Sequence, residues 1–345
     1  MSGINFVSTS LPEFLVNSDC IDDVANQWLG SPAKRQKFVR ISRNSGVNNR
    51  FFIQPYNEII KQSGLNQRSI IFENLGKGLL KKSITKTLAL SSLATADIDG
   101  LLYSSCSMPS IPSVDATVVQ ELGFSPNLYR LPVFQHGCIG GVMNLSLASR
   151  LIKSSNAILV SSLEVCSLVF QNGNDDDTQL VGAAIFSDGA ATALVEKGNC
   201  KLNFVDVYSY LIPNTQFLMG YDIRDDGFHL KLDRLLPKML VDTCPEVIYN
   251  FLQKNELTIN DVDYWLFHPG GKKILDFLDN SLELAADKSY FAREVLAECG
   301  NMSSATIFFV LNKFLSDTKY KSNQNVVMMG IGPGLTIELI LFKTS

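Results

Sequence analysis

The sequence lacks closely spaced cysteines. Its seven cysteines are dispersed along the chain, at positions 20, 106, 138, 166, 200, 244 and 299. No two of them have the separation of a CxxC motif or of a zinc knuckle. An odd, dispersed set of thiols is typical of a reducing compartment. We therefore expect no disulfide framework and no metal site.

The sequence also lacks an excess of basic residues. It has 30 Lys and Arg residues against 34 Asp and Glu residues, which gives a net charge of −4. Proteins that bind nucleic acid draw much of their affinity from a basic surface. DNA and RNA are therefore not expected partners.

Long apolar runs are missing as well. The most apolar window, residues 326–342, is interrupted by three glycines, a proline and a glutamate, so it does not supply the roughly 18 uninterrupted apolar residues of a membrane helix. The first residues, Met-Ser-Gly-Ile-Asn-Phe-Val, do not resemble a secretory signal, which starts with basic residues and continues with an apolar stretch. We expect no membrane span and a cytoplasmic location.

What the sequence does contain is an alternation of helical and strand patterns. Residues 69–92 have the apolar spacing of an amphipathic helix, and residues 100–105 follow a turn as a short strand. Residues 130–134, 142–153 and 157–161 then predict a strand, a helix and a strand. Because two parallel strands cannot be joined by a tight turn, this unit indicates parallel pairing with a helix crossing one face.

The rest of the chain continues this alternation. Apolar segments on both sides of Ser187-Asp-Gly predict a hairpin within residues 183–195, and residues 172–177 predict a solvated loop whose unpartnered acids repel. The remaining expected elements are a helix near 238–253, a strand at 264–267, helices from 272 and 304, and strands at 326–329 and 335–342. No low-complexity linker interrupts the chain, so we expect two α/β halves, 1–197 and 198–345, packed as one body.

Cys138 is a candidate nucleophile. It lies between a strand and the glycine-rich opening of a helix. Glycines permit a sharp turn and close approach of a substrate, and the amino end of a helix favours a thiolate over a thiol. The alternative is a buried structural thiol, which is the usual state of a free cysteine and the one that the pattern favours for the other six.

A histidine and an asparagine occupy comparable positions. His268 follows an apolar strand and precedes Pro-Gly-Gly, and Asn301 follows Gly300 just before a helical run that a serine can cap. Each of these residues alone is often only a cap or part of a turn. One cysteine, one histidine and one asparagine, each next to glycine at the end of a regular element, together indicate thioester chemistry.

Five segments of the chain resemble the type III polyketide synthases, the chalcone and stilbene synthase family of the thiolase superfamily. They occur in family order as GCIGG at 137–141, IFSDGAA at 185–191, HPGGKKILD at 268–276, GNMSSA at 300–305 and GIGPGLTIE at 330–338. The resemblance extends from about residue 37 to the carboxyl end, and the cysteine motif looks more like bacterial members than plant ones. It implies a thiolase-like fold, with two similar α/β halves in a layered α-β-α-β-α body.

The resemblance also implies a reaction and roles for three residues. Cys138 would accept the acyl group of an acyl-CoA starter, His268 would hold it as a thiolate, and Asn301 with His268 would form an oxyanion hole. Decarboxylation of malonyl-CoA develops enolate charge, and each such donor is worth roughly 3 kcal/mol. The extended chain would then cyclise to a pyrone, a resorcinol or a similar aromatic product. The family needs no metal or redox cofactor for this chemistry.

Further matches concern the substrate cavity. Phe186 and Phe228 resemble the paired phenylalanines that the family places between active site and tunnel, although core packing is the alternative for any phenylalanine among 21. Positions that shape the elongation cavity are matched by Cys106, Ser107, Cys166, Leu168, Val169, Gly220 and Ser303. Cysteine or valine stands at three of these positions where chalcone-forming members have threonine, which indicates a more apolar starter, such as a fatty acyl group. Basic residues around the coenzyme A phosphates are matched by Lys37, Arg40 and Arg43, whose alternative is an ordinary solvated helix face.

Three alternatives share part of this pattern. A ketoacyl synthase III-like enzyme that condenses once has the same Cys-His-Asn set, and a hydroxymethylglutaryl-CoA synthase would need a glutamate base, for which Glu164 is the candidate. A non-catalytic ketosynthase-like partner subunit is the third, but the three reactive residues are all present. The resemblance also implies a homodimer in which Ile111 reaches the cavity of the partner.

Overall fold

The main sheet joins the two halves of the chain. Within the described residues, 1–61 and 64–345 of the computed structural model, it has nine strands in the order β11-β12-β13-β8-β1-β7-β6-β4-β5. The first half contributes β1 (Ser2–Ser10), β4 (Gly100–Ser104), β5 (Tyr129–Val133), β6 (Ala157–Val165) and β7 (Asp188–Lys197). The second half contributes β8 (Leu202–Leu211), β11 (Tyr264–Phe267), β12 (Asn325–Gly332) and β13 (Thr336–Thr344).

The two halves repeat one pairing pattern outward from their junction. In the first half β1 and β7, then β7 and β6, are antiparallel, whereas β6 and β4, then β4 and β5, are parallel. In the second half β8 and β13, then β13 and β12, are antiparallel, and β12 and β11 are parallel. This repetition confirms the expectation of two similar α/β halves. The residue bounds 1–197 and 198–345 stay a prediction.

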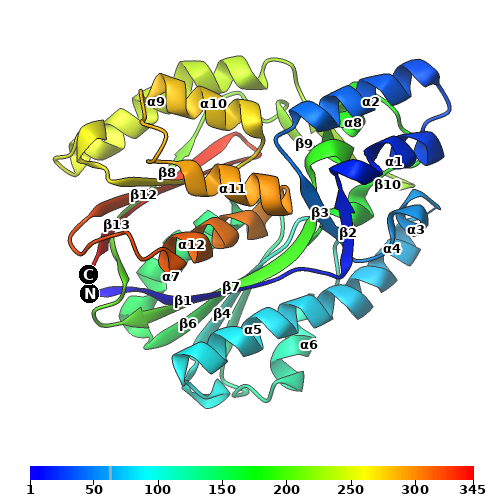
Figure 1. Cartoon of the computed structure of the whole chain (residues 1–345). Helices are drawn as coiled ribbons and strands as arrows, with labels where there is room; N and C mark the ends of the chain where they lie inside the picture. The colour runs from blue at the N-terminus through cyan, green and yellow to red at the C-terminus, as the bar shows by residue number, and fades with distance from the viewer. Residues whose placement is uncertain (62–63) are drawn as a thin grey trace.

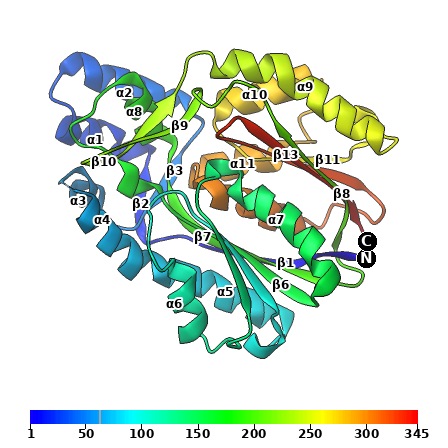
Figure 2. The same ribbon diagram turned by 180° about the vertical axis from the view of Figure 1, so that it is seen from behind.

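Helices complete the layers (Figures 1 and 2). The helices α7 (Gly140–Leu151) and α12 (Thr306–Ser316) lie between the two parts of the sheet, where α7 contacts β6 and β13 and α12 contacts β1 and β11. Five consecutive residues of α12, Ile307 to Leu311, are buried, as expected for a helix enclosed on all sides. The outer layers contain α5 (Lys77–Ser91) and α6 (Val114–Glu121) on one side, and α9 (Leu236–Lys254), α10 (Lys272–Ser281) and α11 (Tyr290–Cys299) on the other.

Smaller elements cover the end of the body near Phe186. They are the strands β2 (Phe14–Asn17) and β3 (Asn49–Phe52), the hairpin of β9 (Met219–Arg224) and β10 (Gly227–Leu232), and the helices α1 (Ile21–Trp28), α2 (Pro32–Asn44), α3 (Tyr56–Lys61), α4 (Leu65–Ile71) and α8 (Asp177–Ile185). The helix expected over 69–92 is formed by the end of α4, a π-helical turn and α5. The described helices include none that is long and apolar enough to span a membrane.

The hairpin expected within residues 183–195 is wrong. Residues 177–185 form α8, and only residues 188–197 form a strand, β7. The carboxylate of Asp176 caps α8 by accepting a hydrogen bond from the backbone N–H of Gln179 at 2.8 Å. A short apolar run fits a buried helix as well as a strand, so the sequence pattern did not separate the two.

The expected loop at 172–176 is present, but its acids have partners. Asp175 lies 3.5 Å from Lys34 Nζ, and Asp177, in the first turn of α8, lies 2.5 Å from Lys37 Nζ. The assumption that these carboxylates repel without partners is therefore wrong, because the chain supplies two lysines from α2.

The junction of the two halves depends on a glycine. Gly3 of β1 pairs with Asn203 of β8, and a Cβ atom at Gly3 would collide with the carbonyl oxygen of Leu202 and lie 2.8 Å from Cys200 Cβ. We expect Gly3→Ala to lower the free energy of unfolding by about 1–3 kcal/mol, because an extra methyl group in this packed junction forces a shift. Denaturant unfolding followed by circular dichroism measures the loss.

Gly78→Ala is the matched control for this substitution. Gly78 lies inside α5 with nothing near the position of a Cβ atom, so alanine there should raise stability slightly through helix propensity. Equal effects at Gly3 and Gly78 would contradict the role of the close approach.

Candidate active site

Cys138 lies on a short turn between β5 and α7. The turn is a single 3-10 turn, η4 (Gly137–Ile139), and α7 begins directly after it. Gly137 has a φ of 55°, and a Cβ atom there would lie 2.7 Å from Cδ of Pro333. Glycine is required at this position because the backbone is left-handed and another segment approaches it closely. The turn leaves Cys138 half-buried at the wall of a cavity of about 260 Å³.

A serine hydroxyl contacts the candidate nucleophile. Ser303 has a φ of 47°, and its Oγ donates a hydrogen bond to Cys138 Sγ at 3.5 Å. The same Oγ lies 3.2 Å from Cys106 Sγ. Burial raises the pKa of the Cys138 thiol to about 11, and the hydrogen bond from Ser303 opposes this rise.

Asn301 connects the other two segments of the site. Its Oδ1 accepts a hydrogen bond from the backbone N–H of Ser303 at 2.8 Å and one from Thr306 Oγ1 at 3.3 Å. Its Nδ2 donates to the carbonyl oxygen of Gly270, in the turn that follows His268, at 3.3 Å. The amide side chain thus holds the histidine turn against the turn that contacts Cys138.

His268 is buried without a side-chain partner. Its backbone N–H donates to the carbonyl oxygen of Met329 at 2.8 Å, which fixes the residue at the end of β11. The side chain is buried, and within residues 1–61 and 64–345 neither ring nitrogen has a hydrogen-bond partner. Burial lowers the pKa of this imidazole to about 4. Burial therefore favours the neutral forms of both His268 and Cys138, and the predicted role of His268 in holding Cys138 as a thiolate stays a prediction.

Apolar side chains enclose the cavity beside Cys138. Phe186 lies at the end of α8, and Phe228 on β10 stacks on Tyr221 with ring centroids 5.7 Å apart. Both phenylalanines line the cavity, together with residues of the β9–β10 hairpin. A backbone bridge joins Phe186 to Asn301: Asn301 N donates to Ile185 O at 2.8 Å, and Ser187 N donates to Asn301 O at 2.9 Å.

Comparison with known proteins assigns this arrangement to a family. Family models for the N-terminal and C-terminal domains of chalcone and stilbene synthases match residues 7–199 and 204–345. The chain belongs to the chalcone and stilbene synthase family. It is a type III polyketide synthase, and therefore an acyltransferase of a family that uses acyl-CoA and malonyl-CoA.

Individual family members match over nearly the whole chain. A 1,3,6,8-tetrahydroxynaphthalene synthase of Streptomyces griseus is 27% identical, covering 96% of this chain and 89% of that protein. A phloroglucinol synthase of Pseudomonas fluorescens is 29% identical over 87% of both. The crystal structure of 1,3,6,8-tetrahydroxynaphthalene synthase from Streptomyces coelicolor A3(2) has a TM-score of 0.95 at 26% identity and 99% coverage of both chains. The thiolase-like fold is thereby confirmed, and these matches support the polyketide synthase over the alternatives.

The predicted pocket residues of this polyketide synthase do not all line the same cavity. Cys106, Gly220 and Ser303 line the Cys138 cavity. Cys166 and Val169 line a second chamber of about 70 Å³, which shares Phe186, Tyr221 and Leu230 with the first. Two others belong to the surrounding structure: Ser107 donates to Glu164 at 2.8 Å, and Leu168 packs in the core.

Glu164 supports the cavity wall from behind. Its buried carboxylate accepts hydrogen bonds from the backbone N–H groups of Cys106 and Ser107, and from Ser304 Oγ. These contacts fix the loop that carries Cys106, so the structure gives Glu164 a bracing role. Tyr221 and Phe134 line the cavity too and were not predicted. Tyr221 could have been predicted from the sequence, because it directly follows the predicted pocket residue Gly220.

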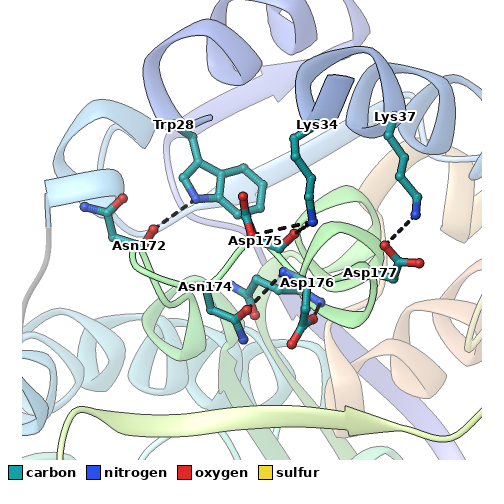
Figure 3. A network of polar contacts seen from close by, with 9 residues as sticks. Trp28, Lys34, Lys37, Asn172, Asn174, Asp175, Asp176 and Asp177 are labelled. Carbon is teal, nitrogen blue, oxygen red and sulfur yellow. Dashed lines mark hydrogen bonds and ion pairs between the residues drawn. The ribbon is translucent and has the colours of Figure 1, made fainter. Parts of the chain in front are cut away.

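The three basic residues proposed for coenzyme A lie on two faces of α2. Lys37 pairs with Asp177 beside α8 (Figure 3), whereas Arg40 and Arg43 line a groove of about 590 Å³ with α1, where Arg43 pairs with Asp22 at 2.9 Å. Residues six apart on a helix point about 120° away from one another. Lys37 and Arg43 therefore point to different sides of α2, and the assignment of the three residues to coenzyme A stays a prediction.

The pKa of Cys138 leads to a direct test. Alkylation of Cys138 by iodoacetamide should keep accelerating above pH 9, because the thiolate fraction of a thiol with a pKa near 11 still rises about tenfold per pH unit there. Ser303→Ala should slow the reaction further at each pH, since it removes a donor to the thiolate. Intact-mass kinetics measures the rate. A rate that levels off near pH 7 would show instead that an ion pair with His268 holds the thiolate.

Proposed function

We propose that Cys138 carries the acyl chain, which grows by decarboxylative condensation with malonyl-CoA and then cyclises to a pyrone, a resorcinol or a similar aromatic product. The observation that carries this proposal is that Cys138 and Ser303 line one apolar cavity, where Ser303 contacts Cys138 Sγ and Asn301 Oδ1 accepts a hydrogen bond from the backbone N–H of Ser303. Family membership supports the reaction class. The resemblance to the family suggests the residue roles, and these contacts support them.

In the loading step, Cys138 Sγ attacks the carbonyl carbon of the acyl-CoA thioester. The new carbon–sulfur bond forms as the bond to the coenzyme A sulfur breaks, and the thiol proton passes through His268 to the departing thiolate. A neutral imidazole is needed for this role, which fits the lowered pKa of His268. Ser303 Oγ stabilises the sulfur as negative charge develops on it.

In the extension step, malonyl-CoA loses carbon dioxide and leaves the bonding electrons as an enolate. Asn301 Nδ2 and a ring N–H of His268 donate to the enolate oxygen, where both are free for new bonds. Among the described residues, Nδ2 has one long contact at 3.3 Å, and the imidazole nitrogens have no hydrogen-bond partner. The enolate carbon then attacks the carbonyl carbon of the acyl-Cys138 thioester, the carbon–sulfur bond to Cys138 breaks with the thiolate as leaving group, and the extended chain is carried by coenzyme A until it reloads on Cys138. Phe186 and Phe228 supply apolar walls that disfavour the malonyl carboxylate more than its neutral product.

The lining of the cavity favours an apolar starter. Aromatic and aliphatic side chains predominate in the Cys138 cavity, and the thiol of Cys106 replaces a hydroxyl found in chalcone-forming members. Lys37, Arg40 and Arg43 remain our candidates for contacts with the coenzyme A phosphates. Of these three, Arg40 alone has no ion pair within the part of the chain that the structure describes, so phosphate binding at Lys37 requires exchange with Asp177.

Two conservative substitutions separate the proposed roles. Asn301→Asp keeps an acceptor for Ser303 N–H and Thr306 Oγ1 but removes the amide donor, so release of carbon dioxide from malonyl-CoA should fall about 100- to 1,000-fold. Loading of a starter on Cys138 should persist. His268→Gln keeps an N–H donor but cannot accept a proton, so it should slow loading more than decarboxylation.

The measurements are intact-mass detection of acyl-Cys138 with hexanoyl-CoA and radiometric release of carbon dioxide from malonyl-CoA. Cys138→Ser controls for acylation at another residue. Equal losses in both assays for both variants would contradict the division of roles. An acyl adduct that persists in Cys138→Ala would refute the assignment of the nucleophile.

We also propose that the protein acts as a homodimer through the edge of β5. This strand pairs only with β4 within the described sheet, and its Leu131 side chain is more than one-third exposed. Ile111, in the loop after β4, is fully exposed. An exposed apolar strand edge is a surface that folded proteins normally cover.

Leu131→Arg should therefore convert a dimer to a monomer in sedimentation at micromolar concentration, because it places an unpaired charge in an apolar interface. Leu90→Arg is the control, since Leu90 is exposed on α5, away from this edge. A wild-type protein that sediments as a monomer would contradict the proposal.

A further inference from the structure

The second chamber contains a buried cation. This chamber of about 70 Å³ lies behind the wall formed by Phe186, Tyr221 and Leu230. Its other sides come from α1, β3, α3, α8 and the turn after β6, and most of them are apolar, including Trp28, Phe52, Ile59, Ile60 and Phe170. The charged residue that lines it is Arg50 of β3.

Arg50 has an unfilled hydrogen-bonding position. The side chain is 4% exposed, its Nη1 donates to the carbonyl oxygen of Ala183, and its carbon Cζ lies 5.4 Å from the ring centroid of Phe52. The other terminal nitrogen, Nη2, is buried and has no hydrogen-bond partner among the residues that the structure describes. No carboxylate within residues 1–61 and 64–345 forms an ion pair with it. Burial lowers the pKa of Arg50 to about 10, which leaves the guanidinium charged at neutral pH.

Two carboxylates that contact residues in or next to the chamber lining have other hydrogen-bond partners. Asp23 accepts a hydrogen bond from Tyr56 Oη at 2.9 Å on the exposed side of α3. Asp188 accepts three hydrogen bonds, from Ser167 N, Ser167 Oγ and Ile53 N. A buried charge normally has a counter-ion, because desolvation of an isolated ion costs several kcal/mol. The single unbalanced positive charge of Arg50 therefore suits the chamber to a monovalent anion.

We propose that this chamber binds a short monocarboxylate, with its carboxylate on Arg50 Nη2 and its apolar body against the aromatic wall. A single negative charge balances the guanidinium, whereas a phosphate dianion would leave an excess charge in apolar surroundings. The guanidinium group donates to a carboxylate with good geometry. The volume accommodates a molecule of only a few non-hydrogen atoms.

The carboxylate could have two sources. One is a free short-chain acid. The other is the terminal carboxylate of a dicarboxylic acyl chain on Cys138 that passes the shared wall, and only this second source rests on the proposed function.

Tryptophan provides a local probe of the chamber. The chain has two tryptophans. Trp28 lines the chamber, and its Nε1 donates to Asn172 O at 3.3 Å (Figure 3), whereas Trp265 is buried on β11 in the core of the second half. Incorporation of 5-fluorotryptophan gives two fluorine resonances, which Trp28→Phe assigns. Trp265 then serves as an internal control.

The first experiment titrates the Cys138→Ser protein with butyrate at constant ionic strength, so that acylation chemistry plays no part. Butyrate should shift the Trp28 resonance saturably and leave Trp265 unchanged, and butyramide, which has the same shape without charge, should have no effect. Arg50→Gln should weaken the butyrate response at least tenfold. An equal response to butyramide, an unchanged affinity in Arg50→Gln, or no response of Trp28 would overturn the proposal.

A second variant covers the case in which Arg50→Gln does not fold. Ile60→Phe keeps Arg50 but fills the chamber, so it should abolish both the Trp28 shift and the rise in Tm that butyrate causes in the parent. An undiminished rise in Tm with Ile60→Phe would place butyrate elsewhere and refute the site.

The two sources are separated by loading the wild-type enzyme with adipoyl-CoA or hexanoyl-CoA. If the chain on Cys138 supplies the carboxylate, adipoyl-Cys138 should shift the Trp28 resonance and hexanoyl-Cys138 should not. A response to butyrate without one to adipoyl-Cys138 assigns the site to a free acid. Failure of both acyl-CoA compounds to load Cys138 would count against the proposed function. The butyrate titration does not depend on acylation, so its result would still decide whether the chamber binds a carboxylate.

Discussion

The short backbone bridge between Phe186 and Asn301 is the contact on which the site depends. It joins the α8–β7 connection of the first half to the α11–α12 connection of the second half, through hydrogen bonds of 2.8 and 2.9 Å. The approach requires glycine at position 300, which has a φ of 71° and where a Cβ atom would lie 3.0 Å from the carbonyl oxygen of Ile185. With the backbone of Asn301 fixed there, its side chain can reach both Ser303 and the turn after His268.

Burial gives the site its chemical character. Desolvation favours the neutral forms of Cys138 and His268. Glu164, buried behind the wall, accepts several hydrogen bonds from the loop and the turn that flank the cysteine. A dry, braced cavity of this kind strengthens the few polar contacts that act on a developing oxyanion.

Most of the basic residues on the surface of α2 have carboxylate partners, unlike the buried Arg50. The sequence of this helix contains five basic residues and no acid, yet three of its cations are paired with carboxylates of α1, α8 and the preceding loop. Such exposed pairs contribute little to stability and exchange easily with a competing anion. Arg50 is the opposite case, because it is buried and has no carboxylate in the described residues to balance it.

The sequence by itself determined the family, the candidate reactive residues and most regular elements. Cys138, His268 and Asn301 can be recognised from the sequence because each lies at the end of a strand or helix, where the turn needs neighbouring glycines. The strand at 264–267 and the helix near 238–253 are likewise set by apolar periodicity over their own length.

Only the tertiary structure decided how distant segments meet. The apolar residues 183–185 are the helical end of α8, which packs on α2, a helix more than 130 positions earlier in the chain. Cys166 and Val169 face a different chamber from Cys106 because Phe186, Tyr221 and Leu230 form a wall between them. Lys37 is separated from Arg43 because α2 is packed between α1 and α8, which draw its cations to opposite sides. The contact of Lys37 with Asp177 joins residues 140 positions apart, and an approach of this kind leaves no periodicity in the sequence.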